Sequence, residues 1–145
     1  MEQLLSMLRA VLSNTFVLYN QAHVIHWNVE GADFPQYHDF FGDVYEELFA
    51  TVDPIAEHLR FLGAFAPATL PDMLATATIQ STITSDFVME SALTNFNDNN
   101  AAMITVIRDA IETADAENEP AVSNFLQERL GAHQKLGWKI RSILK

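Results

Sequence analysis

Residues 22–60 read AHVIHWNVEGADFPQYHDFFGDVYEELFATVDPIAEHLR, and this stretch decides the fold. From Tyr37 onward its apolar residues recur at steps of three or four, which is the spacing of one face of an α-helix. The pattern continues through Pro54, so we predict one kinked helix from Phe34 to a capping Gly63 rather than two short helices. The preceding segment 28–33 contains Gly31 and predicts a turn.

Similar periodicity extends over the rest of the chain. The first segment, up to residue 28, carries two apolar stripes, which indicates a core face and a second buried surface. Further helices are predicted from Asp86 to Ala114 and from Pro120 onward, with a short helix at Asp72 to Ala77 in the long connection before them. No alternating strand pattern is present. The sequence therefore predicts one all-α domain, 1–145, folded as a four-helix bundle.

Composition limits the chemistry that this domain can perform. The chain has no cysteine, which excludes disulfides and thiolate metal sites and is typical of a cytoplasmic protein. It has no uninterrupted apolar run of about 18 residues and no signal-peptide pattern, so we expect no membrane span. The net charge of −11 disfavours nucleic acid and favours cations, although solubility alone is the commoner explanation of such a charge.

Imidazole and carboxylate without thiolate form the ligand set of non-haem iron, manganese or zinc. His26 ends the first helix and His38 begins the second, so the turn between them can bring the two rings together. Asp53 and Glu57 are four residues apart and share a helical face. His23 also lies in this stretch, but a lone histidine on an apolar face is more often a hydrogen-bonded core residue.

The spacing separates the two pairs of candidate ligands. His38 and Asp53 are fifteen residues apart, about 22 Å along a helix, which is too far for one metal ion. Two chains packed antiparallel along this helix would bring the histidines of one to the carboxylates of the other. There is an alternative for Asp53, because Asp-Pro is also a typical start of a helix and Asp53 could be an N-cap.

The combined motif closely resembles the signature of the Dps family, the DNA-binding proteins from starved cells. The resemblance rests on His26-Trp27-Asn28-Val29, Gly31, Phe34, His38, and Asp53 with Ala56-Glu57. The helix order and Trp138 extend it over nearly the whole chain. It implies a ferritin-like four-helix bundle with the short extra helix between helices two and three.

The resemblance also implies a function. Members of the family form hollow shells of twelve subunits, built from two-fold dimers. They oxidise Fe2+ with hydrogen peroxide or oxygen and store Fe3+. By position, the resemblance assigns His26 and His38 of one subunit and Asp53 and Glu57 of its partner to a mono-iron or di-iron ferroxidase centre, which zinc could also occupy. Trp27 beside the site, and Trp138, could take up an oxidising equivalent or simply fill the core.

The sequence departs from the family pattern at Gly42, where the family usually has an aspartate. Asp43 is turned about 100° away from that position, and Glu46 is about one turn further on, so either residue or a water could complete the site. His58 stands where arginine is common after the glutamate. These departures leave open an iron- or zinc-sequestering shell with little turnover.

Two further expectations concern partners. DNA-binding members of the family typically carry a flexible lysine-rich tail, whereas here the first helix begins almost at Met1 and only a modest basic cluster lies near residue 145, so we expect little DNA binding. The acidic residues around the end of the third long helix resemble those that line three-fold pores in Dps shells, or they form a plain solvated loop. They are Asp109, Glu112, Asp115, Glu117 and Glu119.

Overall fold

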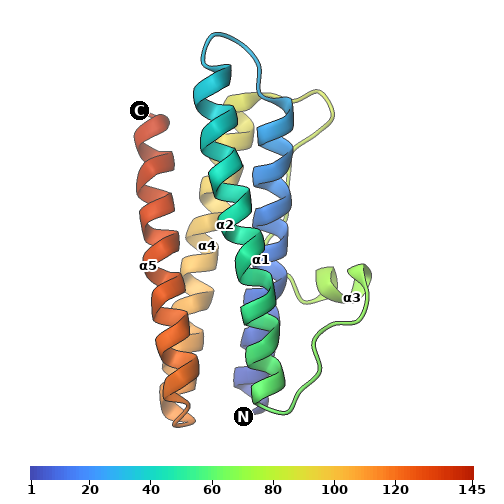
Figure 1. Cartoon of the computed structure of the whole chain (residues 1–145), viewed down its shortest axis with the longest axis vertical. Coiled ribbons are helices and arrows are strands. Elements are labelled where there is room, and N and C mark those ends of the chain that lie inside the picture. Colours follow the sequence, from blue (N-terminus) through green and yellow to red (C-terminus); the bar gives the residue numbers. More distant parts are fainter.

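The computed structural model describes all 145 residues, and helices make up every regular element. The elements are α1 (Glu2–Asn28), α2 (Phe34–Phe61), α3 (Leu70–Ala75), α4 (Met89–Ala116) and α5 (Pro120–Ile143). Figure 1 shows the four long helices α1, α2, α4 and α5 side by side with their axes roughly aligned, and the short α3 lies beside the bundle next to α1. The predicted all-α bundle is confirmed.

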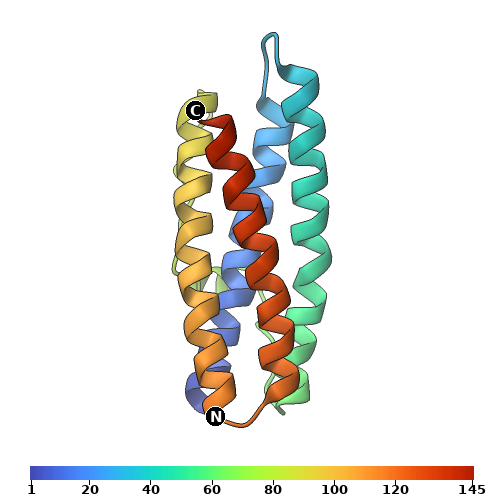
Figure 2. The ribbon, with the colours of Figure 1, turned by 90° about the vertical axis from the view of Figure 1, so that its left-hand side faces the viewer.

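The two hairpins of the bundle are joined by one long connection. Helix α1 packs against α2, α4 packs against α5, and α1 packs against α4. Figure 2 shows that α2 and α4 both run from the top of the bundle to the bottom. The chain must therefore climb the full length of the bundle between them, and this connection carries α3. One long crossover is the topology of ferritin-like bundles.

Helix α2 continues unbroken through Pro54. The alternative in which Asp53 caps a new helix is therefore wrong, because Asp53 lies inside the helix. Proline has no N–H, so α2 lacks only the hydrogen bond that residue 54 would otherwise donate. The apolar side chains on both sides of Pro54, Leu48 and Ile55, are fully buried, and their packing maintains the helix.

The end of α2 is capped as the sequence predicted. Gly63 has a φ of +82°, its N–H donates to the carbonyl of Arg60, and the N–H of Ala64 donates to that of Leu59. This pair of bonds is the Schellman arrangement, which favours glycine at the left-handed position. Two other boundaries differ from the prediction. Helix α3 begins at Leu70, where the Thr69 side chain accepts from the Asp72 N–H, and α4 spans Met89–Ala116 instead of 86–114.

The core lies between the four long helices, and it explains the first of the two stripes on α1. That stripe is buried throughout (Leu4, Leu8, Val11, Leu18, Ala22 and Ile25). In the second stripe only Leu12 is fully buried, whereas Phe16, Tyr19, His23 and His26 are half-buried. Helix α1 thus has one face in the core and one that the single chain covers only in part.

Candidate metal centre

The turn between α1 and α2 brings His26 and His38 into contact, as predicted. Gly31 supplies the tight bend with a φ of +102°, which favours glycine. The two imidazole rings stack with centroids 3.7 Å apart and planes inclined by 18°. The histidine half of the predicted site is therefore assembled within one chain.

Two reciprocal hydrogen bonds fix this pair. Nδ1 of His26 lies 2.6 Å from the carbonyl of His38, and Nδ1 of His38 lies 2.8 Å from the carbonyl of His26. A carbonyl oxygen only accepts, so each Nδ1 must carry the proton. Each Nε2 then keeps its lone pair and has no hydrogen-bond partner in the chain, which is the state of a histidine ready to bind a metal ion.

Gly42 lies directly against the ring of His26. A Cβ built at residue 42 would be 3.3 Å from Cε1 and 3.4 Å from Nδ1 of His26. The imidazole therefore occupies the space beside α2 that a side chain at residue 42 would enter. A side chain at residue 42 would require the His26 ring to shift by a few tenths of an ångström.

The carboxylate half of the predicted site lies near the other end of α2. Asp53 and Glu57 are both exposed, and neither makes a hydrogen bond or an ion pair. No group of three or more histidine, aspartate and glutamate side chains within the chain is placed to hold a metal ion. One chain therefore does not contain a complete site from the four predicted ligands.

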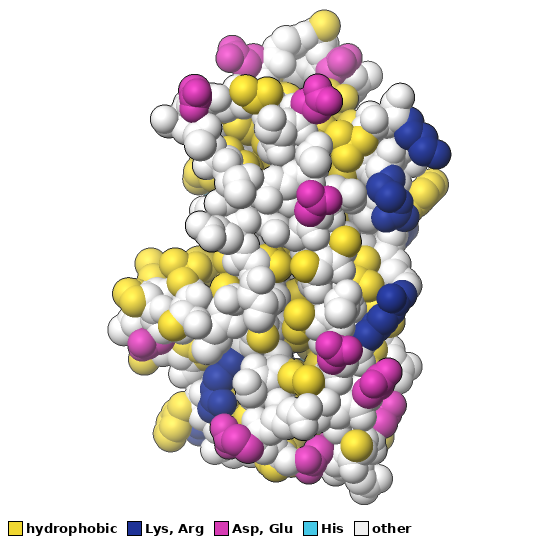
Figure 3. Space-filling model, turned by 180° about the vertical axis from the view of Figure 1, so that it is seen from behind, with side chains coloured by type: hydrophobic (Ala, Val, Ile, Leu, Met, Phe, Trp, Pro, Cys, Tyr) yellow, Lys and Arg dark blue, Asp and Glu magenta, His cyan; other side chains and the backbone are white.

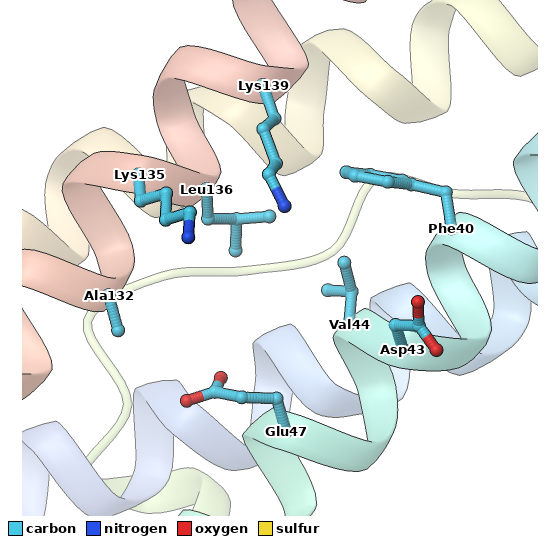
Figure 4. Close-up of a pocket in the computed structure, with 8 residues that line it drawn as sticks. All are labelled: Phe40, Asp43, Val44, Glu47, Ala132, Lys135, Leu136 and Lys139. Atoms are coloured by element: carbon cyan, nitrogen blue, oxygen red, sulfur yellow. The ribbon is translucent and has the colours of Figure 1, made fainter.

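Asp43, which was also a candidate ligand, is on another side of α2. It lines a hollow of about 310 Å³ between α2 and α5, together with Glu47, Lys135 and Lys139. Figure 4 shows these side chains facing one another across the gap between the two helices. The structure does not bring Asp43 to His26 and His38. Glu46 is exposed and lies one helical turn beyond Gly42.

His23 lies one turn before His26 on α1. Its ring is sandwiched between Trp27, at 3.9 Å, and Tyr45, at 4.0 Å. The expected hydrogen bonds of a core histidine are absent, since neither ring nitrogen has a partner and neither is buried from solvent. Partial burial, and next the nearby His26, hold the pKa of His23 below its usual 6.5.

Exposed apolar side chains lie on α2 one turn before the carboxylates and on α3. Phe49 on α2 is 58% exposed, and Leu70 and Leu74 of α3 are also exposed. A hollow of about 560 Å³ separates α3 from α1, lined by Phe16, Val17, Ile79 and the two α3 leucines among others. Figure 3 shows hydrophobic side chains gathered on the lobe at the left and in the band beside it.

Sequence reasoning missed a buried polar cluster between α2, α4 and α5. Arg129 is paired with Glu47, and its Nη2 lies 3.5 Å from Nε2 of His133. The other ring nitrogen of His133 lies 2.8 Å from Oδ1 of Asn100, whose Nδ2 donates to the His133 carbonyl. Burial, and next the Arg129 charge, lower the pKa of His133 to about 3. The only sequence signal was a histidine on an apolar helical stripe.

The acidic residues at the end of α4 are partly brought together. Asp109, Glu112 and Glu117 line a hollow of about 440 Å³ with Gln3 and Met7 of α1. Asp115 and Glu119 do not line it.

His58 is also separate from the predicted ligands, because its ring stacks on Phe125 of α5 at 4.3 Å.

Comparison with known proteins identifies the family. The family model described as a ferritin-like domain matches residues 5–145. A DNA protection during starvation protein from Halobacterium salinarum is 31% identical over 129 residues, covering 89% of this chain and 71% of that protein. The chain belongs to the Dps family. The resemblance inferred from the histidine and carboxylate motif is therefore confirmed.

Solved Dps structures match the fold along the whole chain. An archaeal Dps homologue from Halobacterium salinarum superposes with a TM-score of 0.94 at 29% identity, covering 99% of this chain and 80% of that one. The Dps protein from Vibrio cholerae gives a TM-score of 0.92 at 25% identity, with 99% and 90% covered. That protein is described as a member of the ferritin-like diiron-carboxylate superfamily. In this Dps chain, no helix combines the length and apolar character needed to cross a membrane.

Proposed function

We propose that this Dps protein binds and oxidises Fe2+ at sites formed between two subunits, and stores Fe3+ in a hollow shell of twelve. The observation that carries the proposal is the reciprocal pair of hydrogen bonds between His26 and His38, which leaves two Nε2 lone pairs free. Two unpartnered carboxylates, Asp53 and Glu57, are too far along α2 to reach them in the same chain.

An antiparallel pair of α2 helices joins the two halves. In such a pair, residues that face each other have a constant sum of residue numbers. Placing His38 opposite the partner's Asp53 and Glu57 sets that sum at 91 to 95, so the two-fold axis crosses α2 near Glu46 and Glu47. Phe49 is close to this axis, and pairing would bury its exposed ring. A two-fold axis creates two equivalent sites.

The stacked rings favour two iron ions at each site. A lone pair on Nε2 lies in the plane of its ring, and the two planes are inclined by only 18°. Lone pairs that lie in two stacked, nearly parallel planes cannot converge on one ion, so each histidine serves its own. Hydrogen peroxide accepts two electrons, one from each of two Fe2+ ions, and with two protons gives two waters without releasing a radical. Carboxylates stabilise the Fe3+ product.

Complementation between two inactive variants tests the shared site. His26→Ala/His38→Ala removes one half and Asp53→Ala/Glu57→Ala removes the other. Each variant alone should oxidise no Fe2+ at these sites. A mixed dimer regains one intact site of its two, so random subunit exchange should restore about one quarter of the parent's sites. Stopped-flow oxidation with peroxide and with oxygen, on samples of measured mass, gives the result. No recovery despite proven exchange would refute the shared site.

A sequestering shell with little turnover is the second candidate, and Gly42 is the observation that favours it. The stopped-flow oxidation described above separates the two candidates, because a sequestering shell binds Fe2+ and oxidises it no faster than buffer does.

Iron entry is proposed at the acidic hollow of Asp109, Glu112 and Glu117, where a ring of carboxylates would concentrate cations. Neutralising these three should slow iron uptake most at low salt.

DNA compaction is the third candidate, and the charge of the chain argues against it. The chain has 8 lysine and arginine residues and 19 acidic residues. Non-specific DNA binding depends on contacts between cationic side chains and phosphate. Figure 3 shows Lys and Arg gathered at the edge of the molecule on the side of α5. A gel-shift titration near physiological salt should show no complex, and a discrete band at sub-micromolar protein would place DNA compaction first.

A further inference from the structure

His23 differs from the other histidines of the chain in how its nitrogens are used. His26, His38 and His58 each donate through Nδ1 to a backbone carbonyl, and His133 uses both nitrogens. His23 makes no hydrogen bond through either nitrogen, although both reach solvent. A half-buried imidazole with two unused nitrogens, one turn from a candidate ligand, has capacity for a further bond.

The distance between His23 and His26 suits a shared metal ion. Their ring centroids are 6.2 Å apart and their planes are inclined by 46°. A bound divalent ion lies about 2.1 Å from an imidazole nitrogen, and hence about 3.2 Å from the ring centroid. Two imidazoles on one ion therefore have centroids at most about 6.4 Å apart. The observed 6.2 Å corresponds to an N–metal–N angle of about 150°. The two rings would have to turn toward each other to about 5.2 Å for the roughly 109° angle of tetrahedral coordination.

Residue 42 on α2 faces the His26 ring but supplies no ligand. A Cβ at this position would lie 3.3 Å from Cε1 of His26, and glycine has no side chain to offer a donor atom. Besides His38, which stacks on the His26 ring, two polar aromatic side chains lie near it: Tyr45 at 5.2 Å, edge to face, and His23 at 6.2 Å. A neutral imidazole from α1 can therefore supply a donor where α2 supplies none.

We propose that His23 is a third imidazole ligand of the inter-subunit site, sharing one divalent cation with His26 in place of the carboxylate that Gly42 lacks. This inference rests on the proposed function, because the partner subunit's Asp53 and Glu57 complete the site. Exchanging a carboxylate for imidazole removes one negative charge. The site should accordingly favour divalent ions that accept nitrogen ligands, such as Fe2+, Co2+ and Zn2+, over oxygen-preferring Mg2+ and Mn2+.

The alternative is that His23 only fills the space between Trp27 and Tyr45. The substitution His23→Phe separates the two roles, since phenylalanine keeps an aromatic ring in the sandwich and removes both nitrogens. His58→Phe is the matched control, because it makes the same change on the α5 side of α2. His26→Ala/His38→Ala serves as the control for the proposed function itself.

Binding of Co2+ alone, without oxidant, gives a readout independent of activity. Calorimetry and the visible spectrum of bound Co2+ are measured on assemblies of verified mass. We expect His23→Phe to weaken the tightest Co2+ binding by at least about tenfold and to change the spectrum, with His58→Phe like the parent. Parent-like binding by His23→Phe would overturn the role of His23 and leave the shared site intact. Undiminished binding by His26→Ala/His38→Ala would instead overturn the shared site.

X-ray absorption of the Co2+-loaded parent keeps the inference testable if His23→Phe fails to assemble. Imidazole rings give a characteristic scattering pattern, from which the average number of rings per ion is obtained. An average above one imidazole per ion at one or two ions per site is expected. An average of one ring per ion, with two ions bound, would match His26 and His38 alone and overturn the inference.

Discussion

Two histidine clusters in this molecule use the same side chain in opposite ways. At the α1–α2 turn, His26 and His38 each donate through Nδ1 to the other's carbonyl, and each Nε2 stays free. Between α4 and α5, His133 is fully buried, with Asn100 on one ring nitrogen and Arg129 next to the other. The contrast shows that a histidine is a candidate metal ligand when one of its ring nitrogens has no hydrogen-bond partner. Burial of the ring or a nearby charge does not make it a candidate.

We expect the two histidine clusters to differ in their roles, the buried one in stability and the one at the turn in metal binding. Removing a ring from the buried cluster should mainly destabilise the fold, because the ring is packed and its neighbours are left without partners. Removing His26 or His38 at the turn should cost little stability, because these rings are only half-buried. Its main effect should be the loss of metal binding, because a free Nε2 is removed. The predictions below test this division.

The largest effect is expected for His133→Ala. It creates a buried cavity between Asn100 and Arg129 and leaves Oδ1 of Asn100 without its hydrogen-bond partner, at a cost of about 3 kcal/mol in the free energy of unfolding. His38→Ala is the matched control and should cost about 1 kcal/mol or less. Urea denaturation of subunits, with Fe2+ binding measured alongside, gives both quantities. Equal losses of stability in the two variants would contradict the division.

The pH dependence of stability should also arise from the buried cluster. The pKa of His133 is about 3 in the folded protein and about 6.5 in the unfolded chain, so the unfolded chain takes up the proton first. Stability contributed by neutral His133 is complete above pH 6.5 and is lost as pH falls toward 3. Between pH 7 and 5 the loss is about 2 kcal/mol.

The control for this prediction is His133→Gln, which cannot titrate. Arg129 and Glu47 are the charged groups beside His133, and both are retained in the variant. The difference in unfolding free energy between pH 7 and pH 5 should therefore be smaller in His133→Gln than in the parent. The same slope in both proteins would assign the acid sensitivity to other groups.

The next effect concerns Gly42. Gly42→Asp introduces a carboxylate beside His26 and should tighten Fe2+ binding or add a second binding step. A helix also gains up to about 0.5 kcal/mol when glycine is replaced in this way. The new Cβ would press on the His26 ring, however, at 3.3 Å from Cε1. Gly42→Ala measures this crowding without the carboxylate. An unchanged isotherm for Gly42→Asp would mean that His23 or Glu46 already supplies the ligand.

Much of the fold and the pairing at the α1–α2 turn could be predicted from sequence, because helical periodicity and turn residues act locally. The stripe through Pro54 predicted an unbroken α2, and Gly31 and Gly63 predicted the bends at its two ends. The pairing of His26 with His38 followed from the short turn between them. The 22 Å separation from Asp53 followed from helix rise alone.

The missed features depend on contacts between segments that are distant in sequence. Nothing local to Arg129 indicates that Glu47, 82 residues earlier, pairs with it. The orientation of the His26 and His38 rings depends on backbone carbonyls, which have no sequence signal. His23 was interpreted as a hydrogen-bonded core residue, and only the structure reveals that its nitrogens are unused.

The smallest expected effect separates the two tryptophans, which share the same exposure. Trp27 is 58% exposed and stacks on His23, whereas Trp138 is 59% exposed on α5. If oxidising equivalents leave the iron site through its own aromatic neighbours, limited Fe2+ and peroxide should oxidise Trp27 in preference to Trp138. The two residues have nearly equal exposure in the single chain, so the variant without the iron site decides whether the damage depends on the site. Peptide mass spectrometry quantifies oxygen addition at each residue, with Asp53→Ala/Glu57→Ala as the control that removes the site. Preferential damage at Trp27 that disappears in this control would tie Trp27 to the site. Equal damage at both residues in the parent would instead indicate radicals formed in solution, and Trp27 would then be a packing residue beside His23.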